Sequence, residues 1–248
     1  MAHKRVWIDS RWFLPLLLAI ALLAVGWILI LKPTAPAGCF TFRDGTVRGW
    51  TLDQLYDSNA NPPRRIKSHV SGNPGSNVLY TPFQLSNYRT GALQAEATSI
   101  LITDKSVKSA DIYLNSPDLS RNKSWQGVEG VGIDITRTLT MICRSPVPPF
   151  RFTAQLQVVV TDKATATRHV VAQVDGSGKF LFHTIPNTGK QHIQWKWGKT
   201  LRLGGKDRPL AALTIEKLRV RLTMPGTPEV VECMYGGAWR LADICPVR

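Results

Sequence analysis

The segment from Phe13 to Leu31 contains no charged residue. An α-helix needs roughly 20 apolar residues to cross the hydrocarbon core of a bilayer, so we expect one transmembrane helix over residues 13–31. Lys4, Arg5 and Arg11 precede this segment, against only one acidic residue, Asp9. This excess of positive charge predicts that residues 1–12 stay in the cytosol and that the chain after the helix is exported.

A cleaved signal peptide is the alternative interpretation, because Ala35-Pro36-Ala37 has the small-x-small form of a cleavage site. The apolar segment is longer than the usual core of such a peptide, about 7–15 residues. An uncleaved signal anchor is therefore favoured. We expect residues 32–38 to form an extended linker. Residues 39–248 are expected to form one domain on the periplasmic or extracellular side of the cell membrane.

All four cysteines, Cys39, Cys143, Cys233 and Cys245, lie in the part predicted to be exported, where disulfides persist. Four cysteines allow three connectivities. Pairing of Cys233 with Cys245 is favoured because it closes a short loop, and it leaves Cys39 with Cys143. A zinc site is the alternative, but the sequence has no C-x-x-C element and no nearby pair of histidines. We predict no metal and no cofactor.

Two segments of the exported part alternate strictly between apolar and polar residues, which is typical of half-buried β-strands. Residues 151–160 direct one set of side chains inward: Phe152, Ala154, Leu156, Val158 and Val160. The opposite set is Arg151, Thr153, Gln155 and Gln157. Residues 216–224 place Leu218, Val220, Leu222 and Met224 on one face and Lys217, Arg219 and Arg221 on the other.

Shorter runs rich in β-branched and aromatic residues recur between clusters of Gly, Pro, Asn and Asp. They cover residues 40–42, 78–80, 110–114, 131–135, 169–174, 180–185 and 192–197. Asp175-Gly176-Ser177-Gly178 predicts a hairpin turn. We therefore predict an all-β fold, an antiparallel jelly-roll β-sandwich, with one N-terminal transmembrane α-helix.

The formal charge of +14 favours anionic partners such as acidic polysaccharide, lipid headgroups or acidic proteins. Nucleic acid is not expected, because the domain is predicted to be exported and no nucleic-acid-binding module is recognisable. The bilayer itself is an expected partner, and a protein partner in a membrane complex is possible.

Three passages resemble one protein family. Phe40-Thr41-Phe42-Arg43-Asp44-Gly45-Thr46-Val47-Arg48-Gly49-Trp50 resembles the first strand and turn of carbohydrate-binding modules with the galactose-binding-domain-like fold. Asp118-Leu119-Ser120, followed by residues 130–135, and the segment 213–218 are similar to later passages of the same modules. The resemblance implies a non-catalytic domain that binds glycan.

Many of these modules hold a structural calcium ion in the opening turn and the last strand. In this sequence Arg43 precedes Asp44, and Glu216-Lys217 stands where an Asp-Asp pair is common. A neighbouring cation opposes binding of calcium, which needs about six or more oxygen ligands. We therefore do not predict a calcium site in this chain.

Glycan recognition needs aromatic rings that stack on sugars. Trp125, in the polar segment 121–126, is the leading candidate, and Tyr56 and Tyr88 lie in similarly polar loops. The alternative is that these rings cover the edges of the core. By their alternation, Trp195 and Trp197 are expected to be core residues, as is Trp50, whereas the sequence leaves Trp239 undecided.

Lys217, Arg219 and Arg221 are the candidate basic contacts. They belong to a longer basic stretch that also contains Lys196, Lys199, Arg202, Lys206 and Arg208. Such a patch would attract an anionic ligand. The alternative is a solvated strand face that resists edge pairing.

No catalytic motif is recognisable, so we predict that the chain is not an enzyme. A hydrolase using a carboxylate pair drawn from Asp111, Asp118, Glu129 and Asp134 stays open as a third possibility. The leading hypothesis is a membrane-anchored, non-catalytic domain that recognises a glycan or anionic polysaccharide. The second is a structural or interaction subunit of an envelope membrane complex with no ligand of its own.

Overall fold

The computed structural model describes Leu18, Ile20, Ala21 and residues 37–57, 64–65, 68–70, 83–88, 91–102, 107–143, 151–226 and 233–248. For residues 54–56, 65, 68–70, 88, 98–102 and 233–234 it describes the backbone alone. The chain divides into two compact units, Met1–Pro36 and Ala37–Arg248.

Within the described ranges, no helix is long and apolar enough to cross a membrane. The predicted span over residues 13–31 contributes only Leu18, Ile20 and Ala21 to these ranges. The predictions of a transmembrane helix and a cytosolic N-terminus therefore lie outside the described residues.

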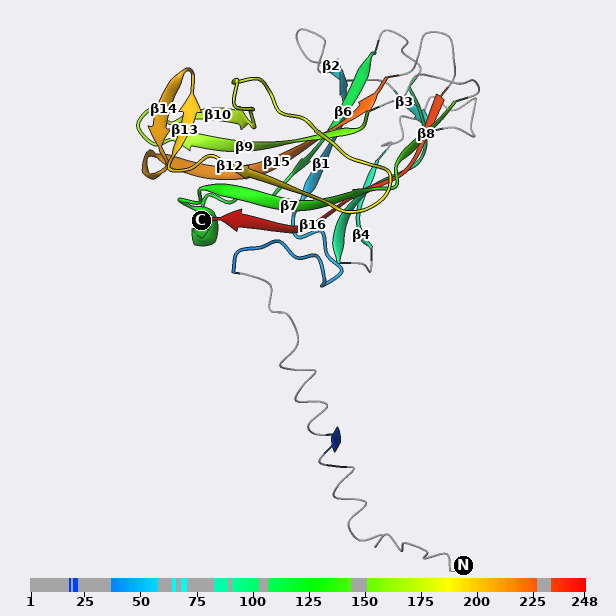
Figure 1. Ribbon diagram of the computed structural model, residues 1–248, viewed down its shortest axis with the longest axis horizontal. Coiled ribbons are helices and arrows are strands. Elements are labelled where there is room, and N and C mark those ends of the chain that lie inside the picture. The colour runs from blue at the N-terminus through cyan, green and yellow to red at the C-terminus, as the bar shows by residue number, and fades with distance from the viewer. Residues whose placement is uncertain are drawn as a thin grey trace, which may run out of the picture. The chain divides into compact units, whose positions relative to one another are not determined.

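The unit from Ala37 to Arg248 consists of antiparallel strands in two large sheets (Figure 1). The first, sheet 1, has the strand order β10-β9-β15-β6-β1-β2, and β11 also pairs with β9. Its strands are β1 (Thr51–Asp57), β2 (Arg64–Arg65), β6 (Ser109–Asn115), β9 (Thr153–Asp162), β10 (Thr167–Ala172), β11 (His183–Thr184) and β15 (Leu213–Pro225).

The second, sheet 2, has the order β12-β7-β16-β5-β3, with β4 paired to β5 and β8 paired to β16. Its strands are β3 (Ser68–Val70), β4 (Gln84–Tyr88), β5 (Ala92–Ile102), β7 (Gly130–Arg137), β8 (Thr140–Cys143), β12 (Gln191–Lys196) and β16 (Cys233–Val247). Two 3-10 turns, η1 (Lys123–Trp125) and η2 (Leu210–Ala212), interrupt the strands.

A separate hairpin joins β13 (Thr200–Leu203) to β14 (Lys206–Pro209). Leu203 pairs with Lys206, so the loop has two residues, Gly204 and Gly205, both with positive φ. Such a loop needs left-handed backbone at both positions, which glycine adopts without steric cost.

One apolar core lies between the two sheets. The inward residues predicted for 151–160 and 216–224 are all buried, and those of β15 meet the buried Val131, Ile133 and Ile135 of β7 in the same cluster. The predicted all-β antiparallel sandwich is thus confirmed, while the finer jelly-roll assignment stays a prediction. Trp50 and Trp195 are buried as predicted, Trp239 is buried as well, and Trp197 is half-buried.

The predicted disulfide pairing is wrong. Cys39 is bonded to Cys245, with their Cα atoms 4.2 Å apart. Cys143 is also disulfide-bonded, and the register of β8 with β16 places Cys233 directly opposite it. Loop length favoured the pair nearest in sequence, but strand pairing brings together cysteines that are remote in the chain.

Candidate functional site

The outer face of sheet 1, the one turned away from the core, is polar at its centre. Side chains alternate between the two faces of a strand, so the neighbours of buried core residues on β6, β9 and β15 share this face. We call the following set the outer face: Asp111, Tyr113, Asn115, Gln155, Gln157, Arg219, Arg221 and Thr223.

The strand register brings glutamines and arginines together at the centre of this face. Gln155 on β9 lies directly opposite Arg221 on β15, and Gln157 lies opposite Arg219. Directly opposed residues of antiparallel strands have Cβ atoms about 4.5–5.5 Å apart. The four side chains therefore form one compact block built from two distant parts of the sequence.

Asp111 compensates the charge of Arg221. Nη2 of Arg221 donates to Oδ2 of Asp111 over 2.7 Å, and the hydroxyl of Thr223 donates to Oδ1 over 2.5 Å. The side chain of Asp111 is fully buried and that of Arg221 is mostly buried. Removing either charge would leave the other buried without a partner, which is strongly unfavourable.

Arg219 is held by the amide of Asn115 instead. Its Nε donates to Oδ1 of Asn115 over 2.8 Å, and Nδ2 of Asn115 donates to Asp53 over 3.0 Å. On β9, Nε2 of Gln157 donates to Oε1 of Gln155 over 3.0 Å. These bonds fix the orientation of the planar groups across the face.

Each arginine of the block lies over an aromatic ring. The guanidinium carbon of Arg219 is 5.3 Å from the ring centroid of Tyr113, and that of Arg221 is 5.1 Å from the centroid of Phe182. A cation within about 6 Å of a ring face is attracted by the ring quadrupole. Tyr113 is half-buried and Phe182 is 37% exposed, so both rings contribute apolar surface accessible to solvent.

Two donors of the block have no acceptor. Gln155 is only 1% exposed, and its Nε2 has no hydrogen-bond partner. Nε of Arg221 is likewise buried without a partner. An unsatisfied buried donor costs about 1–3 kcal/mol, so two of them in one block call for an explanation.

Among the residues predicted to bind ligand, Arg219 and Arg221 come together in this block, and Lys217 lies half-buried on the same strand. Tyr56 is on β1 of sheet 1 and Tyr88 on β4 of sheet 2, and their side chains lie outside the description. The other basic residues of the stretch are not on β15. Lys196 ends β12 of sheet 2, and the separate hairpin of β13 and β14 carries Arg202, Lys206 and Arg208, with Lys199 directly before it.

Trp125 is a core residue, contrary to the expectation of an exposed platform. Its side chain is 2% exposed, its ring lies 5.6 Å from that of Phe40, and its indole N–H donates to the carbonyl of Gly38 over 2.8 Å. The surrounding loop is hydrophilic, but the indole turns inward because both its apolar surface and its single donor find partners there.

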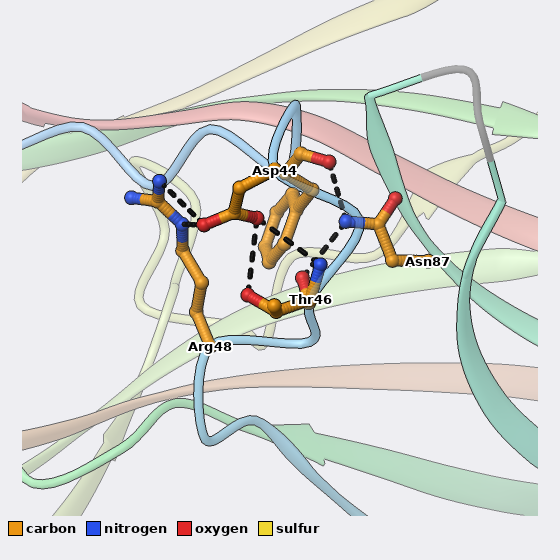
Figure 2. Close-up of polar contacts among 5 residues, drawn as sticks. Asp44, Thr46, Arg48 and Asn87 are labelled. Atoms are coloured by element: carbon orange, nitrogen blue, oxygen red, sulfur yellow. Dashed lines mark hydrogen bonds and ion pairs between the residues drawn. The ribbon is translucent and has the colours of Figure 1, made fainter.

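The opening turn, Phe42 to Arg48, is closed by protein donors (Figure 2). The carboxylate of Asp44 accepts from N and Oγ1 of Thr46 over 3.1 and 3.0 Å and from Nε of Arg48 over 2.9 Å. The backbone bond from Thr46 and the guanidinium of Arg48 lower the pKa of Asp44. Asn87 Nδ2 donates to the carbonyls of Phe42 and Thr46.

This turn does not fit a calcium ion, because a guanidinium already binds the carboxylate and an amide N–H₂ engages two of the carbonyls. In the part of the chain that the structure describes, no group of three or more His, Cys, Asp or Glu side chains is placed to hold a metal ion.

Two of the four carboxylates considered for hydrolysis, Asp111 and Asp134, lie in different sheets. Asp111 belongs to sheet 1, whereas Asp134 belongs to β7 of sheet 2. Burial raises the pKa of Asp134, but Lys190 Nζ and His192 Nδ1, each 2.7 Å from its carboxylate, outweigh that effect and lower the pKa below its usual value. Each aspartate is thus engaged by its own cations.

A groove of about 600 Å³ lies beside β10. Its lining includes the exposed apolar residues Val170, Val174 and Phe180, together with Asp175 and Arg202. Among the described strands, β10 pairs only with β9, so it forms an edge of sheet 1.

The sequence did not identify Tyr113, Phe182 or the two glutamines as site residues. The alternation of residues 151–160 did place Gln155 and Gln157 on the polar side of a strand. That side was expected to face solvent, yet both residues are buried. The two glutamines on the polar side of this strand were the available signal. Only the register of β9 with β15 shows that Arg219 and Arg221 lie beside them.

No family model matches the sequence, and no curated protein matches it. Among solved structures, the chain is similar to a carbohydrate-binding module of the β-sandwich superfamily studied for its promiscuous specificity, with 9% identity and a TM-score of 0.40 over 87% of this chain and 64% of that one. A second is the family 11 carbohydrate-binding module from Clostridium thermocellum in complex with a mixed-linked β-1,3-1,4 tetrasaccharide, with 9% identity, a TM-score of 0.38 and coverage of 84% and 94%.

A third is the CBM22-1 xylan-binding domain of Xyn10C from Paenibacillus barcinonensis, with 11% identity, a TM-score of 0.30 and coverage of 85% of this chain and 94% of that domain. These values describe a distant likeness between β-sandwiches.

Proposed function

We propose that this chain is a non-catalytic glycan-binding protein whose contact surface is the outer face of sheet 1. The observation that carries the proposal is the pair of guanidinium groups that lie over the rings of Tyr113 and Phe182, beside the unpartnered Nε2 of Gln155. Sugar rings combine apolar faces with hydroxyl groups. A surface that alternates aromatic rings with oriented, planar hydrogen-bonding groups matches both features.

Glycan-array binding of the full-length chain in detergent tests this proposal. Tyr113→Ala and Phe182→Ala should each weaken retention of any bound glycan by about tenfold, since each removes one stacking surface. Phe180→Ala is the matched control, because Phe180 is an exposed phenylalanine two residues away that lines the groove beside β10. Equal retention by all three variants, or an absence of glycan binding, would reject the outer face as the site.

Anchoring in a membrane is a further part of the proposal, with the domain outside the cell membrane and the N-terminus in the cytosol. Its support is the uncharged segment Phe13–Leu31 and the basic residues before it. Resistance of the chain to carbonate extraction, with protease cleavage of the domain only from the outer side, is expected. Release of a soluble domain beginning near Gly38 would instead indicate a cleaved signal peptide.

The groove beside β10 favours a second candidate function, an interaction subunit. Exposed Val170, Val174 and Phe180 beside an edge strand suit an extended apolar segment of a protein partner, and Arg202 in the lining favours acidic residues in that segment. A partner that co-purifies in mild detergent and is lost in Val170→Lys, together with no glycan binding, would put this function first.

A further inference from the structure

In the polar block of the outer face, every buried side-chain atom that lacks a hydrogen-bond partner is a donor. Both carboxylate oxygens of Asp111 are engaged, by Arg221 and Thr223. The amide oxygens of Asn115 and Gln155 accept from Arg219 and Gln157. The two buried atoms without a partner are Nε2 of Gln155 and Nε of Arg221, and both are donors. A ligand that completes this block must therefore bring oxygen acceptors.

The block also carries a positive charge that no carboxylate among the described residues contacts. Arg221 is paired with Asp111, whereas Arg219 donates its hydrogen bond to the neutral amide of Asn115. Asp53 reaches Arg219 only through that amide. Lys217 adds a second cation two residues away on β15. The excess charge is therefore located at the Arg219 end of the block.

These two properties distinguish between sugar classes. A sugar hydroxyl both donates and accepts, so a site for a neutral sugar needs free acceptors as well as donors. A carboxylate only accepts, and its two oxygens match the fork of a guanidinium group. The unpartnered donors and the uncompensated guanidinium both fit an acidic sugar.

Resting on the glycan-binding function proposed above, we propose that the outer face selects a uronic acid residue, whose carboxylate binds between Arg219 and Gln155. The ring of Phe182 covers the guanidinium of Arg221. Because that ring is partly exposed, it moves from Arg221 onto the face of the sugar when the ligand binds, and Nε of Arg221 then gains an acceptor on the sugar.

The test compares two forms of one polymer. Polygalacturonate and its fully methyl-esterified form have the same backbone, but esterification removes the charge and one acceptor oxygen. Full-length chain in detergent should bind the free acid at least about tenfold more tightly, as expected for a charge-assisted bidentate contact. Dextran sulfate, with unmodified dextran beside it, reports whether sulfate serves equally well.

Variants assign the preference to the site. Arg219→Gln and Gln155→Met should abolish the preference for the free acid, whereas Arg202→Gln, which removes an arginine from the hairpin surface, should preserve it. Unfolding midpoints of all three variants show that the fold is intact. Arg219→Lys should recover only part of the preference, because an ammonium group cannot form the bidentate contact.

The outcomes separate this inference from the proposed function. Equal binding of the acid and the ester, with weakening by Tyr113→Ala, would overturn uronate selection and keep glycan binding. Equal loss of acid binding in Arg202→Gln and Arg219→Gln would reduce the preference to general surface charge and overturn the site. Dextran sulfate binding as tightly as polygalacturonate would overturn the carboxylate assignment. No binding of any polymer would reject both proposals.

Discussion

Cys39 and Cys245 are joined by a disulfide across a sequence separation of 206 residues. Beside it, the N–H of Phe40 donates to the carbonyl of Ile244 over 2.8 Å in an isolated β-bridge. The bond therefore fastens the first described segment of the domain to β16, the central strand of sheet 2.

Loss of this disulfide should destabilise the domain strongly. A cross-link that closes such a long loop restricts the unfolded chain, and removing one typically costs roughly 2–5 kcal/mol. Cys39→Ser, Cys245→Ser and the double variant should show the same lowered midpoint in urea unfolding followed by near-ultraviolet circular dichroism, because each removes the same bond. A wild-type midpoint in the double variant would contradict the prediction.

Replacing Trp125 should change stability and leave glycan binding intact. Its indole is buried against Phe40 and bonded to Gly38, so Trp125→Ala should cost about 3–5 kcal/mol. Trp125→Phe should cost less, since it keeps most of the apolar volume and loses only the hydrogen bond. Glycan retention measured well below the unfolding midpoint is the critical readout. A loss of retention at unchanged stability would restore the sequence-based interpretation of Trp125 as a sugar platform.

Asn87 should prove important for the opening turn in Figure 2. Its amide donates to the carbonyls of Phe42 and Thr46 and so ties β4 to the turn. Asn87→Ala should lower the free energy of unfolding by about 1–3 kcal/mol, because it leaves acceptors unpaired. Asn122→Ala is the control: it removes one exposed bond to the backbone N–H of Ser124 and should cost clearly less. Similar losses in both variants would argue against the bridging role.

The stability of the domain should depend on pH through His183. Burial lowers the pKa of His183 below its ordinary value of 6.5, and Nε2 lies 3.0 Å from Oε1 of Gln173. The folded state therefore favours the neutral ring. The resulting stability is complete above about pH 6.5 and is lost as pH falls through the lowered pKa of the folded state.

Thermal midpoints across acidic to neutral pH check this prediction. His183→Gln should flatten the decline on the acid side, because glutamine does not titrate. His192→Gln, which replaces an exposed histidine, should retain it. An unchanged acid decline in His183→Gln would assign the effect to another group.

Sequence reasoning located the strands of the core well, because alternation is a local property. In the inward sets of residues 151–160 and 216–224 every second residue is apolar. Only a β-strand places such alternate residues on one face, where they can all be buried. The same alternation predicted burial of Trp195. It also placed Arg219 and Arg221 on the side of their strand that faces away from the core, which is part of the outer face. For Trp125 it failed, since the polarity of neighbouring residues does not reveal where a side chain points.

What the sequence by itself determined, then, is that the part after Cys39 forms strands and which face of the clearest strands turns inward, since a period of two is visible in neighbouring residues. Which strands pair, which cysteines meet and which side chains become neighbours were decided by the tertiary structure alone. Gln155 meets Arg221, and Cys39 meets Cys245, only because β9 pairs with β15 and the segment around Phe40 with β16. Strand pairing joins segments remote in the chain, and its register depends on how the whole core packs.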